Sequence, residues 1–204
     1  MLFIIFLTQQ LSGAYVVIIY ANRIFQDFGD RFKYYAVILL GVIRFCTSLT
    51  TALCSRKFGR RKLFISSGIG MALSMFLSAM FIYLTSDTDG EMIKALEDKR
   101  WVLLILLLSY ECSCALGFTV IPWTLSEELF PITVKGVMGG TMAAIAYFMM
   151  FGMTKNFGLI TLTLGSMNTF FLFSGAALVG TAFIYVFLPE TLGKSFWEIE
   201  KYFM

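Results

Sequence analysis

The sequence of 204 residues contains no histidine, and charged residues make up only 14% of it. Without histidine the commonest general base and metal ligand is missing, and no paired catalytic constellation replaces it. The net charge is only +3 and no basic stripe sits beside aromatic residues, so nucleic-acid binding is not indicated. No phosphate loop, nucleophile elbow or haem-attachment motif occurs. We therefore expect no enzyme, no metal site and no cofactor.

Charge is missing from long stretches of the sequence. Residues 1–22, 63–86 and 156–189 carry no formal charge, and the last of these runs contains 34 residues. Apolar residues make up 58% of the chain, against roughly 45–50% in soluble proteins. About 20 apolar residues in a helix are enough to cross the hydrocarbon core of a bilayer. The composition therefore predicts an integral membrane protein with several spans.

Hydropathy predicts an all-α membrane fold, in which residues 1–204 form a single bundle of six transmembrane helices. We expect the spans at about 1–22, 34–54, 63–84, 101–123, 136–154 and 167–188, followed by a tail at 189–204. Five basic residues lie between positions 56 and 62, which predicts that this short link is cytoplasmic. Six spans then place both termini and segment 126–135 on the cytoplasmic side.

Glycine, proline and cysteine lie within the apolar stretches. Small residues at close spacing predict tight helix packing at three places, Gly136 and Gly140, Gly68 and Gly70, and Gly175 and Gly180. For Gly117, which precedes Pro122 by five residues, the alternative to tight packing is a hinge in a span that the proline bends. We interpret the cysteines as small buried apolar residues: Cys46, Cys54, Cys112 and Cys114.

Four short motifs follow one another across nearly the whole chain. Residues 9–13 read Gln-Gln-Leu-Ser-Gly, residues 59–61 read Gly-Arg-Arg, residues 121–123 read Ile-Pro-Trp, and residues 189–193 read Pro-Glu-Thr-Leu-Gly. In this order and spacing they resemble the C-terminal half of the sugar-porter branch of the major facilitator superfamily. Within that branch the chain is most similar to facilitated trehalose and glucose transporters. The resemblance implies one six-helix bundle, with the N-terminal six-helix half absent.

The resemblance also implies a small-molecule solute, expected to be a sugar, and the side chains that bind it. Gln9 and Gln10 match paired glutamines whose amides contact sugar hydroxyls, and Trp123 matches a tryptophan beneath the sugar ring. The alternatives are that the glutamines join helices and that the tryptophan is an interfacial anchor. The expected substrate-binding set is Gln9, Gln10, Tyr15, Tyr20, Arg44, Trp123 and Tyr147.

Several positions depart from the family pattern, in which polar residues line the cavity. These positions are Tyr15, Arg44, Ala115, Ala146 and Met150. Two interpretations remain open. One is a solute transporter of the sugar-porter type, moving trehalose or a hexose by alternating access in the cell membrane, with an N-terminal half or a second copy as partner. The other is a truncated or degenerate paralogue that transports nothing.

A second set of residues matches the cytoplasmic ion-pair network of the family. In that network basic residues pair with acidic residues and hold the cytoplasmic ends of the helices together when the transporter faces outward. The expected members are Arg60, Arg61, Glu128, Lys135 and Glu190. The alternative is that these charges only set the topology and solvate the loops.

Arg44 and Glu111 are the charges expected in the middle of the membrane. Arg44 lies ten residues after Tyr34, and Glu111 lies ten residues after Trp101, where their inward-running spans begin. At 1.5 Å per residue, both charges lie about 15 Å below the outer surface. An unpaired charge at this depth costs at least about 2.5–3.5 kcal/mol. We therefore expect an ion pair, direct or through water; the alternative is a separate partner for each.

Overall fold

The computed structural model describes residues 1–21, 30–86, 100–130 and 134–188, and these ranges contain helices and turns but no strand. The elements are α1 (Leu2–Leu11), α2 (Val16–Ile19), α4 (Asp30–Phe58), α5 (Arg60–Ser86), α7 (Arg100–Leu116), α8 (Ile121–Leu129) and α9 (Lys135–Phe187). The predicted all-α membrane class is confirmed, because five stretches of the described residues are long and apolar enough to cross a bilayer.

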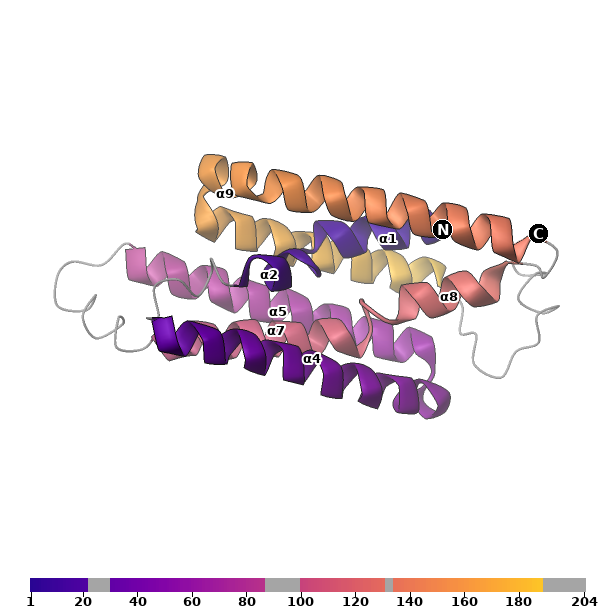
Figure 1. Cartoon of the computed structure of the whole chain (residues 1–204), viewed down its shortest axis with the longest axis horizontal. Helices are drawn as coiled ribbons and strands as arrows, with labels where there is room; N and C mark the ends of the chain where they lie inside the picture. Colours follow the sequence, from indigo (N-terminus) through magenta and orange to yellow (C-terminus); the bar gives the residue numbers. More distant parts are fainter. Residues whose placement is uncertain (22–29, 87–99, 131–133, 189–204) are drawn as a thin grey trace.

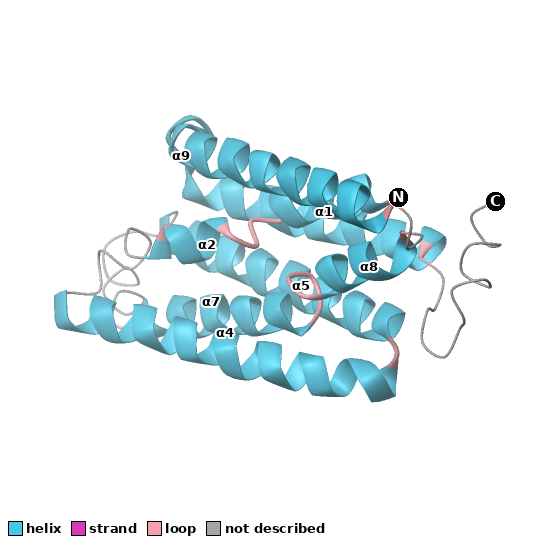
Figure 2. Ribbon diagram, turned by 45° about the vertical axis from the view of Figure 1, so that its right-hand side comes forward, coloured by secondary structure: helices cyan, strands magenta, loops and turns pink. Residues whose placement is uncertain are grey.

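The helices run roughly antiparallel to one another in an elongated bundle (Figures 1 and 2). The start of α1, the α4–α5 junction and the start of α9 lie at one end of the bundle. This arrangement is the one expected for spans that cross the membrane alternately. The basic link at the α4–α5 junction and the N-terminus therefore share one side.

Helix α9 contains 53 residues and folds back on itself at Gly165 (Figure 1). Gly165 has φ of 80° and ψ of 159°, a backbone conformation that glycine adopts without steric cost. The two arms of α9 therefore supply the fifth and sixth spans. The spans predicted at 136–154 and 167–188 leave a short link at 155–166, whereas the first arm stays helical up to Leu164. No charge other than Lys155 interrupts this stretch, so the helix can continue beyond the predicted end of the span.

The first and fourth spans are each interrupted, although hydropathy predicts both as continuous. The first breaks into α1 and α2 at residues 12–15, where Gly13 has φ of 81° and lies against the ring of Phe173. The fourth breaks into α7 and α8 at residues 117–120. Pro122 lies in the first turn of α8, where its missing N–H costs no hydrogen bond. Proline therefore begins a new helix here instead of bending a continuous one.

Helix α5 lies at the centre of the bundle and packs against α7 and α9, while α1 packs on α9. Three of the predicted packing glycines lie in this core. A Cβ at Gly68 would meet Thr181 and Phe118, one at Gly70 would meet Ser113, and one at Gly180 would meet Thr8 and Phe118. Nothing lies within 4 Å of a Cβ at the other three, Gly136, Gly140 and Gly175. The packing prediction is therefore confirmed for one of the three pairs, Gly68 and Gly70, and for Gly180 alone.

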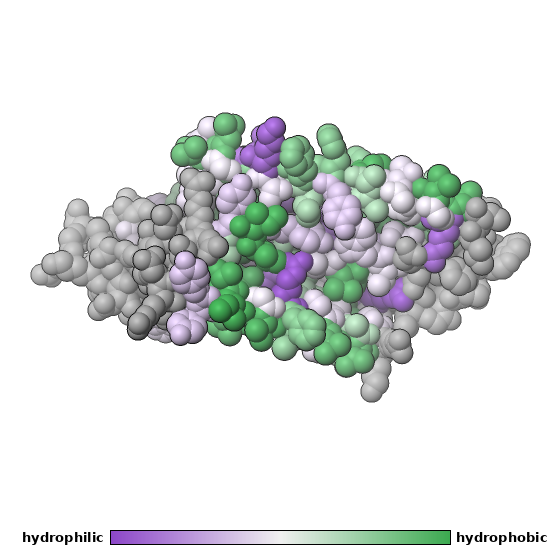
Figure 3. Space-filling view, in the orientation of Figure 1, coloured by the Kyte–Doolittle hydropathy of each residue, from purple (hydrophilic) through white to green (hydrophobic). Residues whose placement is uncertain are grey.

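The outer surface of the bundle is apolar. Large apolar side chains are exposed along α4 and α9, and hydrophilic patches are few on the face shown in Figure 3. Helix α4 lies at the edge, since only 11% of Tyr34–Ser55 is buried within the bundle, against 61% of Leu2–Ile19. A surface of this kind is stable in lipid rather than in water.

Candidate functional site

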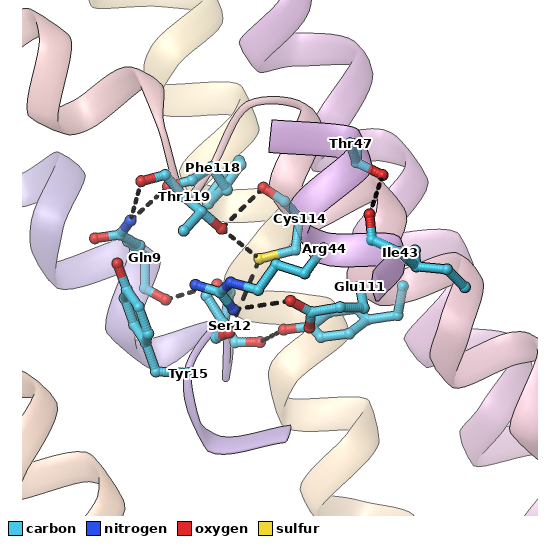
Figure 4. A network of polar contacts seen from close by, with 12 residues as sticks. Gln9, Ser12, Tyr15, Ile43, Arg44, Thr47, Glu111, Cys114, Phe118 and Thr119 are labelled. Carbon is cyan, nitrogen blue, oxygen red and sulfur yellow. Dashed lines mark hydrogen bonds and ion pairs between the residues drawn. The ribbon is translucent and has the colours of Figure 1, made fainter. Parts of the chain in front are cut away.

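The interruptions of the first and fourth spans lie close together, and a side chain of each span binds the backbone at the interruption of the other span (Figure 4). The buried amide of Gln9 donates from Nε2 to Phe118 O at 2.5 Å and reaches Thr119 O at 3.5 Å. In the reverse direction, the buried hydroxyl of Tyr110 donates to Ser12 O at 2.8 Å. Inside a membrane, carbonyl groups released from a helix need such partners. The two breaks therefore stabilise each other.

Arg44 and Glu111 meet beside these breaks. Arg44 Nη1 lies 2.8 Å from Glu111 Oε1, and this bond joins α4 to α7. The Arg44 side chain is 23% exposed, whereas that of Glu111 is 0% exposed. Figure 4 shows the guanidinium between Tyr15 and the carboxylate, and its central carbon lies 5.3 Å from the centre of the Tyr15 ring. Arg44 and Glu111, which the sequence predicts at equal depth in the membrane, are thus in direct contact.

Aromatic side chains continue from Arg44 across the bundle. The Trp123 indole donates from Nε1 to the Tyr15 hydroxyl at 3.4 Å. The rings of Trp123 and Tyr147 have centres 5.7 Å apart, and Phe6 packs edge-on against Trp123 at 5.0 Å. Tyr147 is 59% exposed, so this end of the row lies open at the surface of the bundle. We call Arg44, Tyr15, Trp123 and Tyr147 the polar–aromatic row.

Two of the expected substrate-binding residues lie apart from this row. The Tyr20 hydroxyl donates to Thr154 O at 3.0 Å, and its ring packs against Phe157, which places it between α2 and α9. Gln10 is buried, with 4% exposed, and its side chain makes no hydrogen bond within the described part of the chain. Gln9 binds the break of the fourth span through its side chain, whereas Gln10 contacts the first break through its backbone carbonyl, which accepts from Gly13 N.

The expected cytoplasmic network is described only in part. Arg61 donates from Nη2 to Tyr185 O at 2.5 Å, and its guanidinium lies 5.5 Å from the centre of the Tyr185 ring. Arg61 therefore binds the last turn of α9, where a cation is favourable because the helix carbonyls are unpaired. The side chain of Glu128 and the whole of Glu190 lie outside the described residues, so the acidic half of the network does too.

Sequence reasoning overlooked Tyr110, Cys114 and Thr119, which contact the breaks. The Cys114 thiol lies 3.1 Å from the Thr119 hydroxyl, which itself donates to Cys114 O at 3.1 Å. A tyrosine next to a glutamate inside an aliphatic span was the available signal for Tyr110. The interpretation of every cysteine as buried is wrong, because only Cys114 is buried and Cys46 is exposed on α4. Helix α4 lies at the edge of the bundle, so part of its surface has no neighbour among the residues that the structure describes.

A separate cavity of about 460 Å³ lies at the end of the bundle where the chain begins. Its walls include Met1, Phe3, Phe130, Val137 and Met142, and none of the polar–aromatic row. Its lining is mainly apolar and lacks convergent polar groups, so it offers no specific recognition. Within the described ranges, no cluster of three or more cysteine, aspartate or glutamate side chains could hold a metal ion.

The polar–aromatic row combines hydrogen-bonding groups with flat apolar faces. A guanidinium donates up to five hydrogen bonds, and a tyrosine hydroxyl both donates and accepts. Aromatic faces bind the apolar side of a ring-shaped ligand. The row can therefore bind a small polar molecule that has hydroxyl groups on its edge and C–H groups on its face.

Comparisons with known proteins identify the family. The Sugar (and other) transporter family matches residues 1–203 of the chain. The facilitated trehalose transporter Tret1 of Anopheles gambiae is 29% identical over 197 residues, covering 96% of this chain and 24% of that protein. The facilitated trehalose transporter Tret1-2 homolog of Drosophila simulans is 32% identical over 197 residues, covering 96% of this chain and 39% of that protein. The chain thus spans between a quarter and two fifths of the length of these relatives.

Solved structures show the same fold. The major facilitator superfamily proton:xylose symporter XylE, bound to 6-bromo-6-deoxy-D-glucose, superimposes with a TM-score of 0.84 at 22% identity. The match covers 98% of this chain and 42% of that one. The inward open conformation of the xylose transporter XylE from E. coli gives a TM-score of 0.79 at 23% identity, over 98% of this chain and 40% of that one. The major facilitator fold predicted from the four motifs is confirmed, and the match over residues 1–203 shows that the chain belongs to the Sugar (and other) transporter family.

Proposed function

We propose that the chain forms one wall of a carrier that moves a sugar, trehalose or a hexose, across a membrane by alternating access. The observation that carries this proposal is the polar–aromatic row beside two interrupted spans. Transporters of several folds bind their substrates where helices are broken near the middle of the bilayer. Family membership and the names of the trehalose transporters that the chain resembles support a sugar as the solute.

In this proposal each side chain of the polar–aromatic row makes a particular type of contact with the sugar. Trp123 and Tyr147 provide ring faces for the C–H side of the sugar, and Tyr15 and Arg44 provide hydrogen bonds to its hydroxyls. Gln9 Oε1 is buried and has no partner within the described part of the chain, so it accepts from a sugar hydroxyl only after the helices move apart during alternating access. Gln10 and Tyr20 complete the expected set, at positions next to the first break and at the end of α2.

The remaining parts of the carrier belong to the same proposal. A second bundle, an N-terminal half or another copy of the chain, faces the polar–aromatic row, because alternating access requires two bundles that rock around one site. The basic link and both termini lie in the cytoplasm of the cell, and the carrier works in the plasma membrane. Arg60, Arg61, Glu128, Lys135 and Glu190 close the cytoplasmic side when the site faces outward.

Equilibrium binding of labelled sugar tests the proposal directly. The chain is reconstituted in lipid nanodiscs and saturated with labelled trehalose or D-glucose. Replacing Trp123 with alanine should weaken binding about tenfold, since an aromatic contact contributes up to about 1.5 kcal/mol beyond area burial. Trp101→Ala is the matched control, because Trp101 is exposed at the start of α7 and should leave affinity unchanged. Equal effects of the two variants, or no saturable binding, would contradict the proposal.

Uptake into proteoliposomes tests the need for a second bundle. We expect the purified monomeric chain to give no saturable uptake of labelled trehalose or glucose, while fusion to an N-terminal half restores it. The physical reason is that a single bundle has no opposite wall to close the site on either side. Saturable, inhibitor-sensitive flux from a monomer would refute this, and saturable flux from a homodimer would identify the second copy as the partner.

A further inference from the structure

The ion pair between Arg44 and Glu111 is asymmetric in its exposure. The Arg44 side chain is 23% exposed beside the Tyr15 ring, while Glu111 is completely buried behind it on α7. In Figure 3 a hydrophilic patch lies near the middle of the face shown, among pale and apolar side chains. A solute that reaches the polar–aromatic row therefore meets the guanidinium and not the carboxylate.

The pair also has unused hydrogen-bonding capacity. A single bond, from Arg44 Nη1 to Glu111 Oε1, joins the two groups, and Glu111 Oε2 is buried with no partner in the described part of the chain. A guanidinium has five N–H donors, so most of those on Arg44 remain for another acceptor. The Tyr110 hydroxyl, next to Glu111 in the sequence, is committed to Ser12 O. Within the described part of the chain, Arg44 is thus the charge partner of Glu111 and the donor of its one hydrogen bond.

The charge balance at this depth determines which solutes can bind. Described charged side chains other than this pair lie towards the ends of their helices, with the exception of Lys155 on the first arm of α9, which packs over the Phe151 ring. Arg44 and Glu111 together are neutral, so the row presents strong hydrogen-bond donors without a net charge. A neutral sugar can accept hydrogen bonds from those donors. The carboxylate of an acidic sugar must lose its hydration, and Glu111 already neutralises the positive charge that would compensate for this cost.

We propose that Glu111 is a specificity-determining residue, which makes the site select neutral over acidic sugars by cancelling the charge of Arg44. This inference rests on the proposed sugar-binding function and adds the chemical class of sugar and the residue that sets it. Glu111 acts from behind Arg44, without touching the solute. Its removal should convert the row into a site for a carboxylate-bearing sugar, because arginine binds carboxylates strongly when it is unpaired.

Binding of D-glucuronate and D-glucose to the full chain in nanodiscs tests the inference. Glu111→Gln keeps the shape of the side chain and removes its charge, and we expect it to raise the affinity for glucuronate relative to glucose at least about tenfold. Glu111→Met should give the same shift if the amide perturbs folding. The double variant Arg44→Gln with Glu111→Gln, neutral again, should return the ratio to that of the wild-type chain.

Thr163→Lys is the matched control for net charge. It also adds one positive charge, at an exposed position of α9 beside the fold-back at Gly165, and the glucuronate-to-glucose ratio should not change. An unchanged ratio in folded Glu111→Gln and Glu111→Met overturns the inference, and so does an equal shift in Thr163→Lys. Saturable glucose binding by the wild-type chain is a separate readout, and its absence overturns the proposed function instead.

Discussion

At the scale of single residues, Arg44 and Glu111 each depend on the other for stability. Replacing either with alanine leaves a charge inside the bilayer without its partner, which should lower the free energy of unfolding by about 3 kcal/mol. The double alanine variant should recover part of this loss, with a coupling of roughly 0.5–3 kcal/mol. Folded yield and thermal unfolding in detergent measure both quantities. Strictly additive losses would show that the two side chains do not stabilise each other.

Gln9 and Gln10 are adjacent in the sequence, but within the described residues only the Gln9 side chain makes a hydrogen bond. The two positions can therefore be compared directly. Gln9→Leu removes the donor to Phe118 O and should cost about 1–3 kcal/mol, because a buried carbonyl is then left without a partner. Gln10→Leu removes no hydrogen bond within the described residues and should cost less. Thermal unfolding of both variants in one detergent checks the difference. Equal losses would mean that the bond across the breaks contributes nothing.

The predictability of the site varied from residue to residue. Arg44 and Glu111 could be placed together from the sequence because the rise of a helix converts residue number into depth. The partner of Gln9 could not be predicted, since it is the backbone of a residue 109 positions away, released by a break that hydropathy does not detect. Arg61 was expected to pair with acidic residues, and no sequence pattern indicated the last turn of α9 as its partner.

At the scale of elements, glycine contacts between α5 and α9 lead to a prediction. A Cβ at Gly68 would overlap the Thr181 hydroxyl and lie 2.8 Å from the Phe118 ring, so Gly68→Ala should destabilise the bundle by about 1–3 kcal/mol. Nothing lies within 4 Å of a Cβ at Gly175 on α9, so Gly175→Ala should be neutral or stabilising by up to about 1 kcal/mol. Thermal unfolding compares the two, and a Gly68→Ala variant as stable as the wild-type chain would contradict the packing.

The number of spans and their helical structure could be predicted more reliably than the points at which a span is interrupted. Charge-free runs are long enough to indicate spans, whatever happens inside them. Interruptions at residues 12–15 and 117–120 change few apolar residues, so a hydropathy average does not register them. The local signals in the fourth span, Gly117 and Pro122, were interpreted as a hinge and a bend, because the place of Pro122 within the first turn of α8 depends on where α7 ends.

At the scale of the whole molecule, the topology is open to direct measurement. In a cysteine-free background, a thiol introduced by Lys57→Cys should not react with membrane-impermeant reagents in intact cells, because we propose that the basic link faces the cytoplasm. Ser166→Cys, beside the fold-back of α9 at the opposite end of the bundle, should react readily. Labelling at position 57 from outside the cell would reverse the orientation of every helix.

The interlocked breaks have a consequence for the order in which the protein is made. The carbonyl of Ser12 receives its hydrogen bond from Tyr110, and the amide of Gln9 finds its acceptors at residues 118 and 119. Synthesis proceeds from the N-terminus, so about a hundred residues must emerge from the ribosome before these bonds can form. Until then the exposed carbonyls of the first span have no partner in lipid. We therefore expect this span to stay at the water-filled insertion machinery until the fourth span arrives.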